Sequence, residues 1–352
     1  MRNDRFTLVS VALAIAVLLA AGGWLVYQRV SGSPSAAAGA ASGEDEGGLA
    51  IASAGPPVAA DPSALTFKRL TDPARSVAVD PAGRTVAVFT DGARTVRLTG
   101  PVRTFKEPKF TSATVSTDAW VRLAPQEWKA GEENAAWLRP WLTTALADTG
   151  PDALAIATQY LFGMPEQKDA KGVRFAGDAD FGPFSDTDPD GRAENSDFFD
   201  YLGITYKFPD GGRSTPQPDR FGDLDCSGYL RMVYGYRLGY PVRSANTAGV
   251  GLPRRAFAMA QFGPGVAVVE NRGASALTRL QPGDLLFFDL DPADGPQADH
   301  SGIYLGLDDA GHYRFLSSRS KANGPTFGDF GGAAILDGSG RFAARFRSAR
   351  RL

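Results

Sequence analysis

Cys226 is the only cysteine among 352 residues, and it stands in the phrase Asp-Cys-Ser-Gly at the start of a helix-like run. A cysteine attacks a carbonyl carbon as a thiolate, and the partial positive charge and free N–H groups of a helix N-terminus favour that form. Asp225 is well placed to cap this helix, and Gly228 would leave backbone room for a substrate. The first-turn N–H groups, including that of Cys226, could form part of an oxyanion site. The pattern indicates a candidate nucleophile, although a lone cysteine is most often a small buried hydrophobe.

The general base for such a nucleophile would be a histidine, and the chain has two, His300 and His312. His300 begins the run His-Ser-Gly-Ile-Tyr-Leu-Gly, which is typical of a strand and would hold an imidazole rigidly. A third group should orient the ring. On spacing alone, structural roles are favoured over catalysis. One cysteine and two histidines, without a Cys-x-x-Cys pair, argue against a structural zinc site, and we expect no cofactor and no metal.

Four stretches of the chain resemble the NlpC/P60 cysteine peptidases of bacterial cell walls. They are Tyr-Leu-Gly-Ile-Thr-Tyr at 201–206, Asp-Cys-Ser-Gly-Tyr-Leu at 225–230, Leu-Gln-Pro-Gly-Asp-Leu-Leu-Phe-Phe at 280–288 and His-Ser-Gly-Ile-Tyr-Leu-Gly at 300–306. Their order and approximate spacing fit the family over roughly 197–330. The sequence is most similar to anchored or secreted actinobacterial members.

This resemblance implies an α+β fold of the papain-like type, in which the helix bearing the cysteine packs on an antiparallel sheet. It implies hydrolysis of peptide bonds in peptidoglycan stem peptides, typically the bond from D-γ-glutamate to a diamino acid, through a thioester acyl-enzyme. Two alternatives stay open. One is a related amidase or acyltransferase on the same fold, and the other is a non-catalytic peptidoglycan-binding module.

The resemblance also implies roles for particular residues. Carried over by position, Cys226 is the nucleophile, His300 is the base, and Tyr206 is the tyrosine that helps the oxyanion site. The segment between Tyr206 and Cys226 is longer than usual, so the alternative for Tyr206 is a half-buried aromatic beside the cleft. The third catalytic position, which is usually His in the family, falls on Ser317 in the phrase Phe-Leu-Ser-Ser-Arg.

The third position has two further candidates, Ser318 and His312. Residues five apart in a strand face opposite sides, so His312 and Ser317 cannot both face the cleft of a regular strand. A serine can accept a hydrogen bond from imidazole, but it is short and uncharged and should orient the ring less firmly. This weak third position motivates the alternative of a binding module.

Arginines near these motifs are candidate ligands for substrate carboxylates, which a guanidinium can hold in bidentate fashion. Arg319 follows the third position, and Arg254 and Arg255 precede a helix-like run. Ordinary surface charge is the favoured interpretation for each of them. The basic tail at 345–352 would either contact anionic wall polymers or dock on its own domain.

The N-terminus carries an uncharged apolar run that follows Arg2 and Arg5 and ends at Trp24 and Tyr27. As a helix with a rise of about 1.5 Å per residue, it would extend roughly 33 Å, which is enough to cross a bilayer core. We therefore expect an uncleaved membrane anchor over 1–30, with a cleaved signal sequence as the alternative. Both place the rest of the chain outside the cytoplasm, either on a single-pass anchor or secreted.

The composition divides the chain into five expected segments. They are the anchor or signal at 1–30, an Ala/Gly/Ser/Pro tether at 31–62, a small β-rich module at 63–130, a helical extension with an acidic loop at 131–196, and the NlpC/P60-like domain at 197–352. Short β-branched runs separated by Pro-Ala-Gly and Asp-Gly turns predict the strands of the module. The formal net charge of -2 shows no basic excess and argues against a nucleic-acid partner.

The acidic loop has a partial calcium-binding pattern. Asp186, Asp188, Asp190 and Asp197 fall at positions 1, 3, 5 and 12 of such a loop, with Gly191 at position 6. A proline interrupts the loop, and position 12 holds Asp in place of the longer Glu. A solvated acidic loop is therefore the favoured interpretation, and calcium binding is the alternative.

Overall fold

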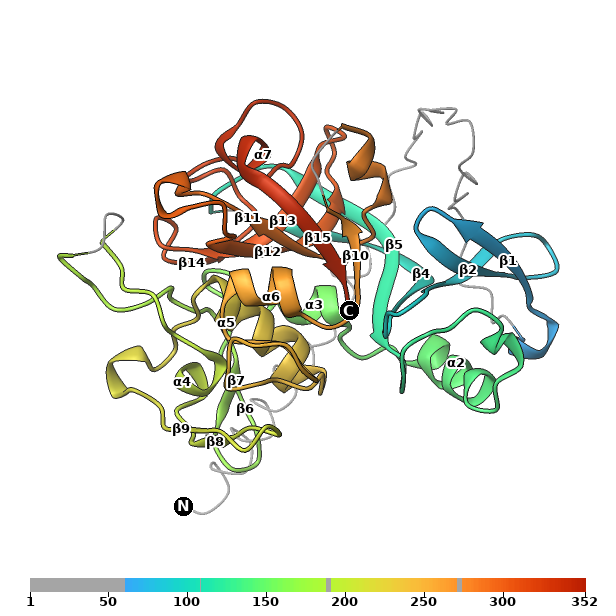
Figure 1. The fold of residues 1–352 in the computed structure, drawn as a ribbon, viewed down its shortest axis with the longest axis horizontal. Helices are drawn as coiled ribbons and strands as arrows, with labels where there is room; N and C mark the ends of the chain where they lie inside the picture. The colour runs from blue at the N-terminus through green and yellow to red at the C-terminus, as the bar shows by residue number, and fades with distance from the viewer. Residues whose placement is uncertain (1–60, 108, 188–190, 271–273) are drawn as a thin grey trace, which may run out of the picture. The chain divides into compact units, whose positions relative to one another are not determined.

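An antiparallel sheet in sequence order opens the described part of the chain (Figure 1). Its strands are β1 (Thr66–Thr71), β2 (Ala74–Val79), β3 (Thr85–Thr90), β4 (Thr95–Lys106) and β5 (Thr114–Leu123). Gly83 and Gly92 lie at positive φ in the turns that follow β2 and β3, which glycine adopts without steric cost. The core on this sheet includes Phe89, Trp128 and, from helix α2 (Leu138–Ala147), Leu138.

The structure is a computed structural model that describes residues 61–107, 109–187, 191–270 and 274–352. These residues belong to one compact unit, Ile51–Leu352. The predicted anchor or signal sequence, and nearly all of the predicted tether, lie outside the described residues. Within these described ranges, no helix combines the length and the apolar character needed to cross a membrane.

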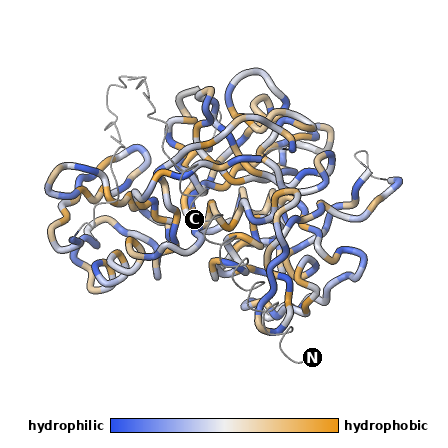
Figure 2. The backbone as a smooth tube through the Cα atoms, turned by 180° about the vertical axis from the view of Figure 1, so that it is seen from behind, coloured by the Kyte–Doolittle hydropathy of each residue, from blue (hydrophilic) through white to orange (hydrophobic). Residues whose placement is uncertain are grey.

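A second antiparallel sheet contains the motifs around His300. Its strands, in spatial order, are β10 (Val266–Val269), β15 (Phe346–Arg351), β11 (Leu285–Phe288), β12 (His300–Leu307), β13 (Tyr313–Arg319) and β14 (Gly324–Thr326). Both faces of this sheet are buried, because Leu285 and Ile303 pack into one core while Leu286 and Tyr304 pack into another. Burial on both faces accounts for the continuous apolar runs of β11 and β12. Figure 2 shows hydrophobic positions concentrated along these central strands and the helices beside them.

Helices cover both faces of the second sheet (Figure 1). On one face lie α3 (Ala153–Thr158), α5 (Cys226–Leu230) and α6 (Ala256–Phe262), and α5 continues as a π-helical segment, η4 (Arg231–Arg237). On the other face lies α7 (Arg341–Arg345), whose Phe342 packs against Phe288 and Phe315. The mixture of helices with antiparallel sheet confirms the predicted α+β class.

The remaining elements are short. They are α4 (Phe198–Leu202), the two-residue to three-residue strands β6 (Gln167–Lys168), β7 (Arg174–Ala176), β8 (Tyr206–Lys207) and β9 (Arg213–Ser214), and the 3-10 turns η1 (Pro62–Ala64), η2 (Glu132–Asn134), η3 (Pro218–Arg220), η5 (Ala274–Arg279) and η6 (Pro292–Asp294). The predicted helical extension divides its packing between the two sheets, because α2 joins the core of the first sheet and α3 joins a core of the second.

The basic tail docks on its own domain as β15, between β10 and β11. Its Arg351 is buried and forms a bidentate ion pair with Asp284, with both N···O distances at 2.8 Å. The same guanidinium donates to the Thr90 hydroxyl of β3 at 2.7 Å. The backbone of Leu352 accepts from the amide of Arg94 at 2.7 Å, and a further contact reaches the amide of Thr95. The end of β15 therefore joins the two sheets.

We expect the Arg351→Met variant to lose about 3–5 kcal/mol of unfolding free energy, because Asp284 would be left as a buried, unpaired carboxylate. Urea denaturation measures this loss. The matched control is Arg279→Met, which removes a pair with Asp72 in which the side chains are 43% and 67% exposed. That exposed pair should contribute less than about 1 kcal/mol. Equal losses in the two variants would contradict this account of the junction.

Candidate active site

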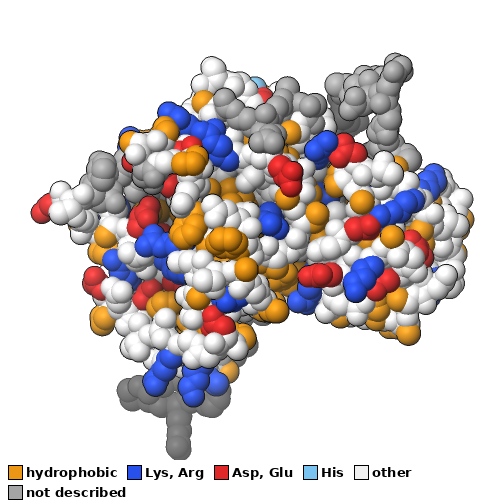
Figure 3. Space-filling model, in the orientation of Figure 1, with side chains coloured by type: hydrophobic (Ala, Val, Ile, Leu, Met, Phe, Trp, Pro, Cys, Tyr) orange, Lys and Arg blue, Asp and Glu red, His pale blue; other side chains and the backbone are white. Residues whose placement is uncertain are grey.

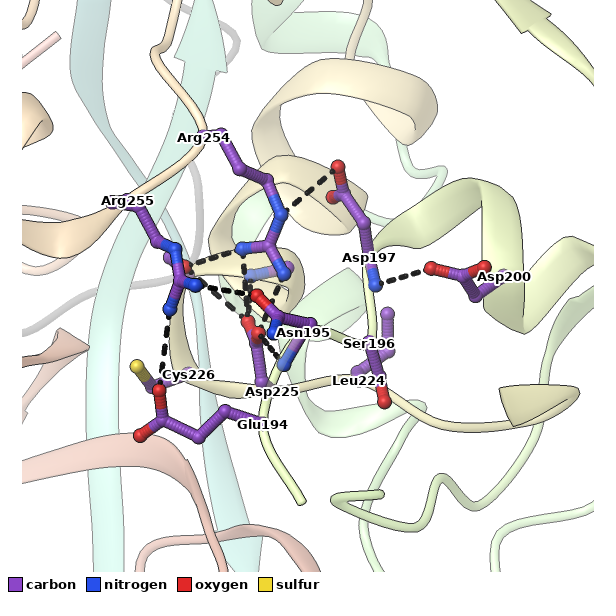
Figure 4. Close-up of polar contacts among 12 residues, drawn as sticks. Glu194, Asn195, Ser196, Asp197, Asp200, Leu224, Asp225, Cys226, Arg254 and Arg255 are labelled. Carbon is purple, nitrogen blue, oxygen red and sulfur yellow. Dashed lines mark hydrogen bonds and ion pairs between the residues drawn. The ribbon is translucent and has the colours of Figure 1, made fainter. Parts of the chain in front are cut away.

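Cys226 begins α5, and Asp225 is its N-cap. The Asp225 carboxylate accepts from the amide of Gly228 at 2.7 Å and from the amide of Asn195 at 3.0 Å. The Asp225 amide in turn donates to the carbonyl of Ser196 at 2.9 Å. The segment before α4 is thereby fixed against the start of the cysteine helix (Figure 4).

Gly228 makes this close approach possible. A Cβ atom at this position would lie 2.2 Å from the Ser196 carbonyl oxygen and 3.0 Å from the Asp197 Cα. The expectation that Gly228 leaves room for a substrate is therefore wrong, because the protein's own backbone occupies that space.

Arg254 neutralises the Asp225 cap. Its guanidinium lies 2.6 Å from the Asp225 carboxylate and 3.5 Å from that of Asp197, and it donates to the Ser227 hydroxyl at 2.7 Å. Burial favours a raised pKa for Asp225, but the charge and hydrogen bonds of Arg254 outweigh it and hold the pKa below the usual range. Arg254 is thus an internal partner of the helix cap, which corrects its interpretation as ordinary surface charge.

His300 begins β12 on the second sheet and is only 8% exposed. Its ring centroid lies 5.9 Å from that of Phe288 and 5.7 Å from that of Phe342. Burial, and then the positive charges of Arg319 and Arg341, lower the pKa of His300 to about 3. The imidazole is therefore neutral at neutral pH. Its Nε2 is buried without a hydrogen-bond partner among the described residues, so it can accept a proton when Nδ1 carries the ring hydrogen.

Cys226 and His300 line one cavity of about 550 Å³. Besides Cys226 and His300, the polar and charged residues among the described lining are Glu194, Asp225, Ser227, Arg255, Asp291, Gln297, Asp299, Arg319, Ser320, Lys321 and Arg341. The Cys226 sulfur lies 3.9 Å from the Asp299 carbonyl oxygen. The two reactive side chains predicted from the sequence therefore share one cavity.

The Cys226 thiol is protonated in this environment. Burial raises its pKa, the carboxylates of Asp225 and Glu194 raise it further, and Ser301 opposes the shift through hydrogen bonding. The expectation that the helix start favours the thiolate is therefore wrong for this site, because burial and two carboxylates outweigh the helix terminus. The structure presents a neutral thiol and a neutral imidazole.

The predicted third group, Ser317, is fully buried on β13. Its hydroxyl accepts from Arg319 Nε at 2.9 Å. Phe342 contacts both sides of this arrangement, with its ring 4.4 Å from the Arg319 guanidinium carbon and 5.7 Å from the His300 ring. The described contacts thus join Ser317 to Arg319, and the described lining of the cavity includes Arg319 but not Ser317.

The two other candidates for the third group lie elsewhere. Ser318 points to the opposite face of β13 and donates to the Leu224 carbonyl at 2.5 Å. His312 lies before β13, and its Nδ1 is 2.6 Å from the Asp337 carboxylate. It borders a separate surface pocket with Arg314 and Asp329. Neither Ser318 nor His312 belongs to the described lining of the cysteine cavity.

Tyr206 lies in β8 and is half-buried in an aromatic cluster. Its ring centroid is 4.7 Å from that of Phe198 and 5.0 Å from that of Phe208. The described residues that line the cavity do not include it. The structure therefore brings Cys226 and His300 together but does not bring Tyr206 to them.

Glu194 and Arg341 are among the lining residues that sequence reasoning missed. Glu194 pairs with Arg255, with a distance of 3.3 Å between the carboxylate and the guanidinium, and Figure 4 shows it beside Cys226. Arg341 is exposed and begins α7. Neither residue belongs to a recognisable motif, so only the folded chain reveals their positions. Arg255 lies at the cavity wall, in contrast to the internal position of Arg254.

Asp197, which holds position 12 of the partial calcium-binding pattern, is already engaged in other contacts and is not available to bind an ion. Asp197 caps α4 and lies 3.0 Å from Arg231 in a fully buried ion pair. Asp188 and Asp190 lie outside the described residues. In the part of the chain that the structure describes, no group of three or more His, Cys, Asp or Glu side chains is placed to hold a metal ion.

The cysteine lies at a helix start and the histidine at a strand start, and both line one cavity of an α+β fold. This arrangement is expected of a thiol hydrolase. Comparison with protein families identifies the class further. Residues 203–324 match the model of the NlpC/P60 family, so this chain carries an NlpC/P60 domain. The matched region contains Cys226, His300 and Ser317. No curated protein matches the chain.

We expect alkylation of Cys226 by iodoacetamide to be slow at neutral pH and to accelerate as the pH rises above the ordinary thiol range. The reason is that burial and the carboxylates of Asp225 and Glu194 raise the thiol pKa. The alkylation rate is measured across pH, and the pH of half-maximal rate gives the thiol pKa. Limited access to the thiol lowers the rate at every pH but does not move this midpoint. In Glu194→Gln the curve should move to lower pH, because one negative charge is removed. A wild-type midpoint below pH 8 would contradict the neutral thiol.

We expect Gly228→Ala to destabilise the protein by about 1–3 kcal/mol, because the added methyl group overlaps the Ser196 carbonyl. Helix propensity alone would favour Ala by up to about 1 kcal/mol, so the sign of the effect tests the packing. Thermal or urea unfolding measures it. The control is Gly340→Ala, where a Cβ meets nothing within 4 Å. A neutral or stabilising Gly228→Ala would show that the segment before α4 can move away.

Proposed function

We propose that this protein is a cell-wall cysteine peptidase with a papain-like catalytic domain. Its substrate would be a peptidoglycan stem peptide, and the cleaved bond would join D-γ-glutamate to a diamino acid. The observation that carries the proposal is that Cys226 and His300, which both fall within the NlpC/P60 match, line one cavity. The buried, unpartnered Nε2 of His300 supplies the proton acceptor that a neutral thiol requires.

The first half of the proposed reaction forms a thioester. As the Cys226 sulfur attacks the carbonyl carbon, the thiol proton passes to His300 Nε2. The negative charge collects on the carbonyl oxygen, where first-turn N–H groups of α5 can donate to it. The carbon–nitrogen bond then breaks, and the imidazolium returns the proton to the departing amine.

The second half releases the acid. A water molecule gives a proton to His300 and attacks the thioester carbon, the carbon–sulfur bond breaks, and the sulfur recovers the proton. Burial and the positive charges of Arg319 and Arg341 lower the pKa of His300, and this makes its imidazolium a stronger acid than a free one. That property suits protonation of an amine leaving group, which departs poorly as an anion.

Ser317 has a positioning role in this proposal. Its hydroxyl holds Arg319 Nε at 2.9 Å, and the charge of Arg319 in turn acts on His300. Tyr206 is proposed as an oxyanion helper on the family resemblance alone. The contacts of Tyr206 with Phe198 and Phe208 favour the alternative of a half-buried structural aromatic.

We also propose that the N-terminal apolar run anchors the protein in the cell membrane, with the catalytic domain on the extracytoplasmic side. A stem peptide in the wall would then lie within reach of a tethered domain. Lysine and arginine side chains are interspersed with acidic ones on the face shown in Figure 3. This mixture fits the formal net charge of -2 and does not favour a nucleic-acid partner.

A second candidate is a non-catalytic peptidoglycan-binding module. The raised pKa of the Cys226 thiol favours it, because a resting thiolate is the usual mark of a reactive cysteine. In that case the same cavity would bind the stem peptide without cleaving it.

The deciding experiment digests purified peptidoglycan and defined stem peptides with the full chain, and identifies the products by mass spectrometry. We expect cleavage at the D-γ-glutamyl bond and a loss of at least about 1000-fold in Cys226→Ala, because the nucleophile is removed. The Cys226→Ala protein should unfold cooperatively like the wild type, which separates lost chemistry from lost folding.

Other outcomes assign the alternatives. Cleavage between glycan and peptide would indicate an amidase, and products joined to an added amine would indicate an acyltransferase. Binding of the stem peptide with no cleavage by the wild type would indicate the binding module. Activity that survives unchanged in Cys226→Ala would exclude a cysteine mechanism.

A further inference from the structure

The wall of the cavity beside His300 carries positive charge that no carboxylate of the described residues pairs with. Arg319 is 4% exposed and lines the cavity. Its Nε donates to Ser317, and one terminal nitrogen donates to the carbonyls of Gly332 at 2.8 Å and Gly328 at 3.3 Å. Its other terminal nitrogen, NH2, is buried with no hydrogen-bond partner among the described residues.

Most buried guanidinium groups of the described residues pair with a carboxylate, whereas Arg319 and Arg220 do not, and Arg220 donates to Gln217, Ser196 and the Glu194 carbonyl. Arg231, Arg254 and Arg351 are likewise buried or nearly so, and each forms an ion pair. Burial lowers the pKa of Arg319 to about 9, and the charges of Glu107 and Asp329 offset only part of that shift. A guanidinium group held in this way beside a cavity can bind an anion through its unused nitrogen.

Arg341 adds a second charge on the same wall. It is exposed, lines the cavity, and makes no ion pair among the described residues. The positive charges of Arg319 and Arg341 both act on His300, and both residues line the same cavity as the candidate base. Arg255 lies in the same cavity but already pairs with Glu194 at 3.3 Å, which makes it a natural comparison.

The Arg319 guanidinium is held ready for a ligand. Ser317 and two backbone carbonyls fix its orientation, and the ring of Phe342 lies 4.4 Å from its central carbon. The remaining terminal nitrogen has two N–H groups in the fixed guanidinium plane and can donate to a carboxylate oxygen. Little side-chain freedom would be lost on binding.

We propose that Arg319 and Arg341 form a carboxylate-binding subsite that selects stem peptides by the state of the D-glutamyl α-carboxylate. This inference rests on the proposed function. When glutamate is joined through its γ-carbonyl, its α-carboxylate stays free a few bonds from the scissile amide. A free carboxylate satisfies the buried nitrogen, whereas an amidated one offers a neutral group whose own N–H groups face the guanidinium donors. The site therefore distinguishes non-amidated from amidated stem peptides.

The test compares two synthetic stem peptides that differ only in a D-glutamate α-carboxylate or α-carboxamide. We expect the full-length wild type to favour the carboxylate peptide in kcat/KM by about 10- to 100-fold, as for a lost hydrogen bond to a charged group. Arg341→Met, at an exposed position, should reduce this ratio. Arg319→Lys, which keeps the charge but loses the planar fork, should reduce it too. Arg255→Met should leave the ratio unchanged.

The ratio distinguishes a lost subsite from damaged folding, because misfolding lowers both rates together. Equal cleavage of the two peptides by the wild type would overturn the subsite and leave the proposed peptidase intact. If the wild type cleaves neither peptide, the peptidase proposal fails, and calorimetric binding of the two peptides to Cys226→Ala decides the subsite. Tighter binding of the carboxylate peptide supports the subsite, and equal binding or none overturns it.

Discussion

The buried ion pair between Asp225 and Arg254 holds the site together. Asp225 caps α5 through Gly228, fixes the Asn195 amide, and lies 2.6 Å from Arg254. Arg254 reaches on to Asp197, which caps α4 and pairs with Arg231. One charge network thus joins two helix starts to the position of the thiol. Because these charges are buried, removing Arg254 would leave Asp225 without an ion pair, and removing Asp197 would leave Arg231 without one.

Burial then decides the chemistry at the cavity. Placing the thiol beside Asp225 and Glu194 disfavours a thiolate, and placing the imidazole beside Arg319 and Arg341 disfavours an imidazolium. The two effects work together, because each keeps its group neutral, and an ion pair between Cys226 and His300 is avoided at rest. In the proposed reaction, transfer of the thiol proton to His300 must therefore precede or accompany the attack by sulfur.

The sequence predicted the secondary structure well where the residue pattern has a single structural interpretation. Apolar runs predicted the strands around His300 and a helix at Cys226, and the α+β class followed from their order. It did not decide the position of β15, because Phe-Arg-Ser-Ala-Arg-Arg fits both a tail that contacts wall polymers and a tail that docks on its own domain. Its arginines are satisfied by distant partners: Arg351 by Asp284 and Arg347 by Asp289. Glu194 and Arg341 escaped prediction for the same reason, since their positions depend on contacts between segments far apart in the chain.

The first sheet also acts on the site, at a distance. Glu107, at the end of β4, accepts from the Thr326 hydroxyl and the Phe327 amide at 2.7 Å each. The next carbonyl, that of Gly328, accepts from Arg319. The β-rich segment therefore helps to fix the guanidinium that acts on His300. A carboxylate bound at Arg319 and Arg341 would offset the positive charge that lowers the pKa of His300, so the imidazole would become a better base as the substrate binds. The interaction of the substrate carboxylate with these two arginines would then both bind the substrate and raise the basicity of His300.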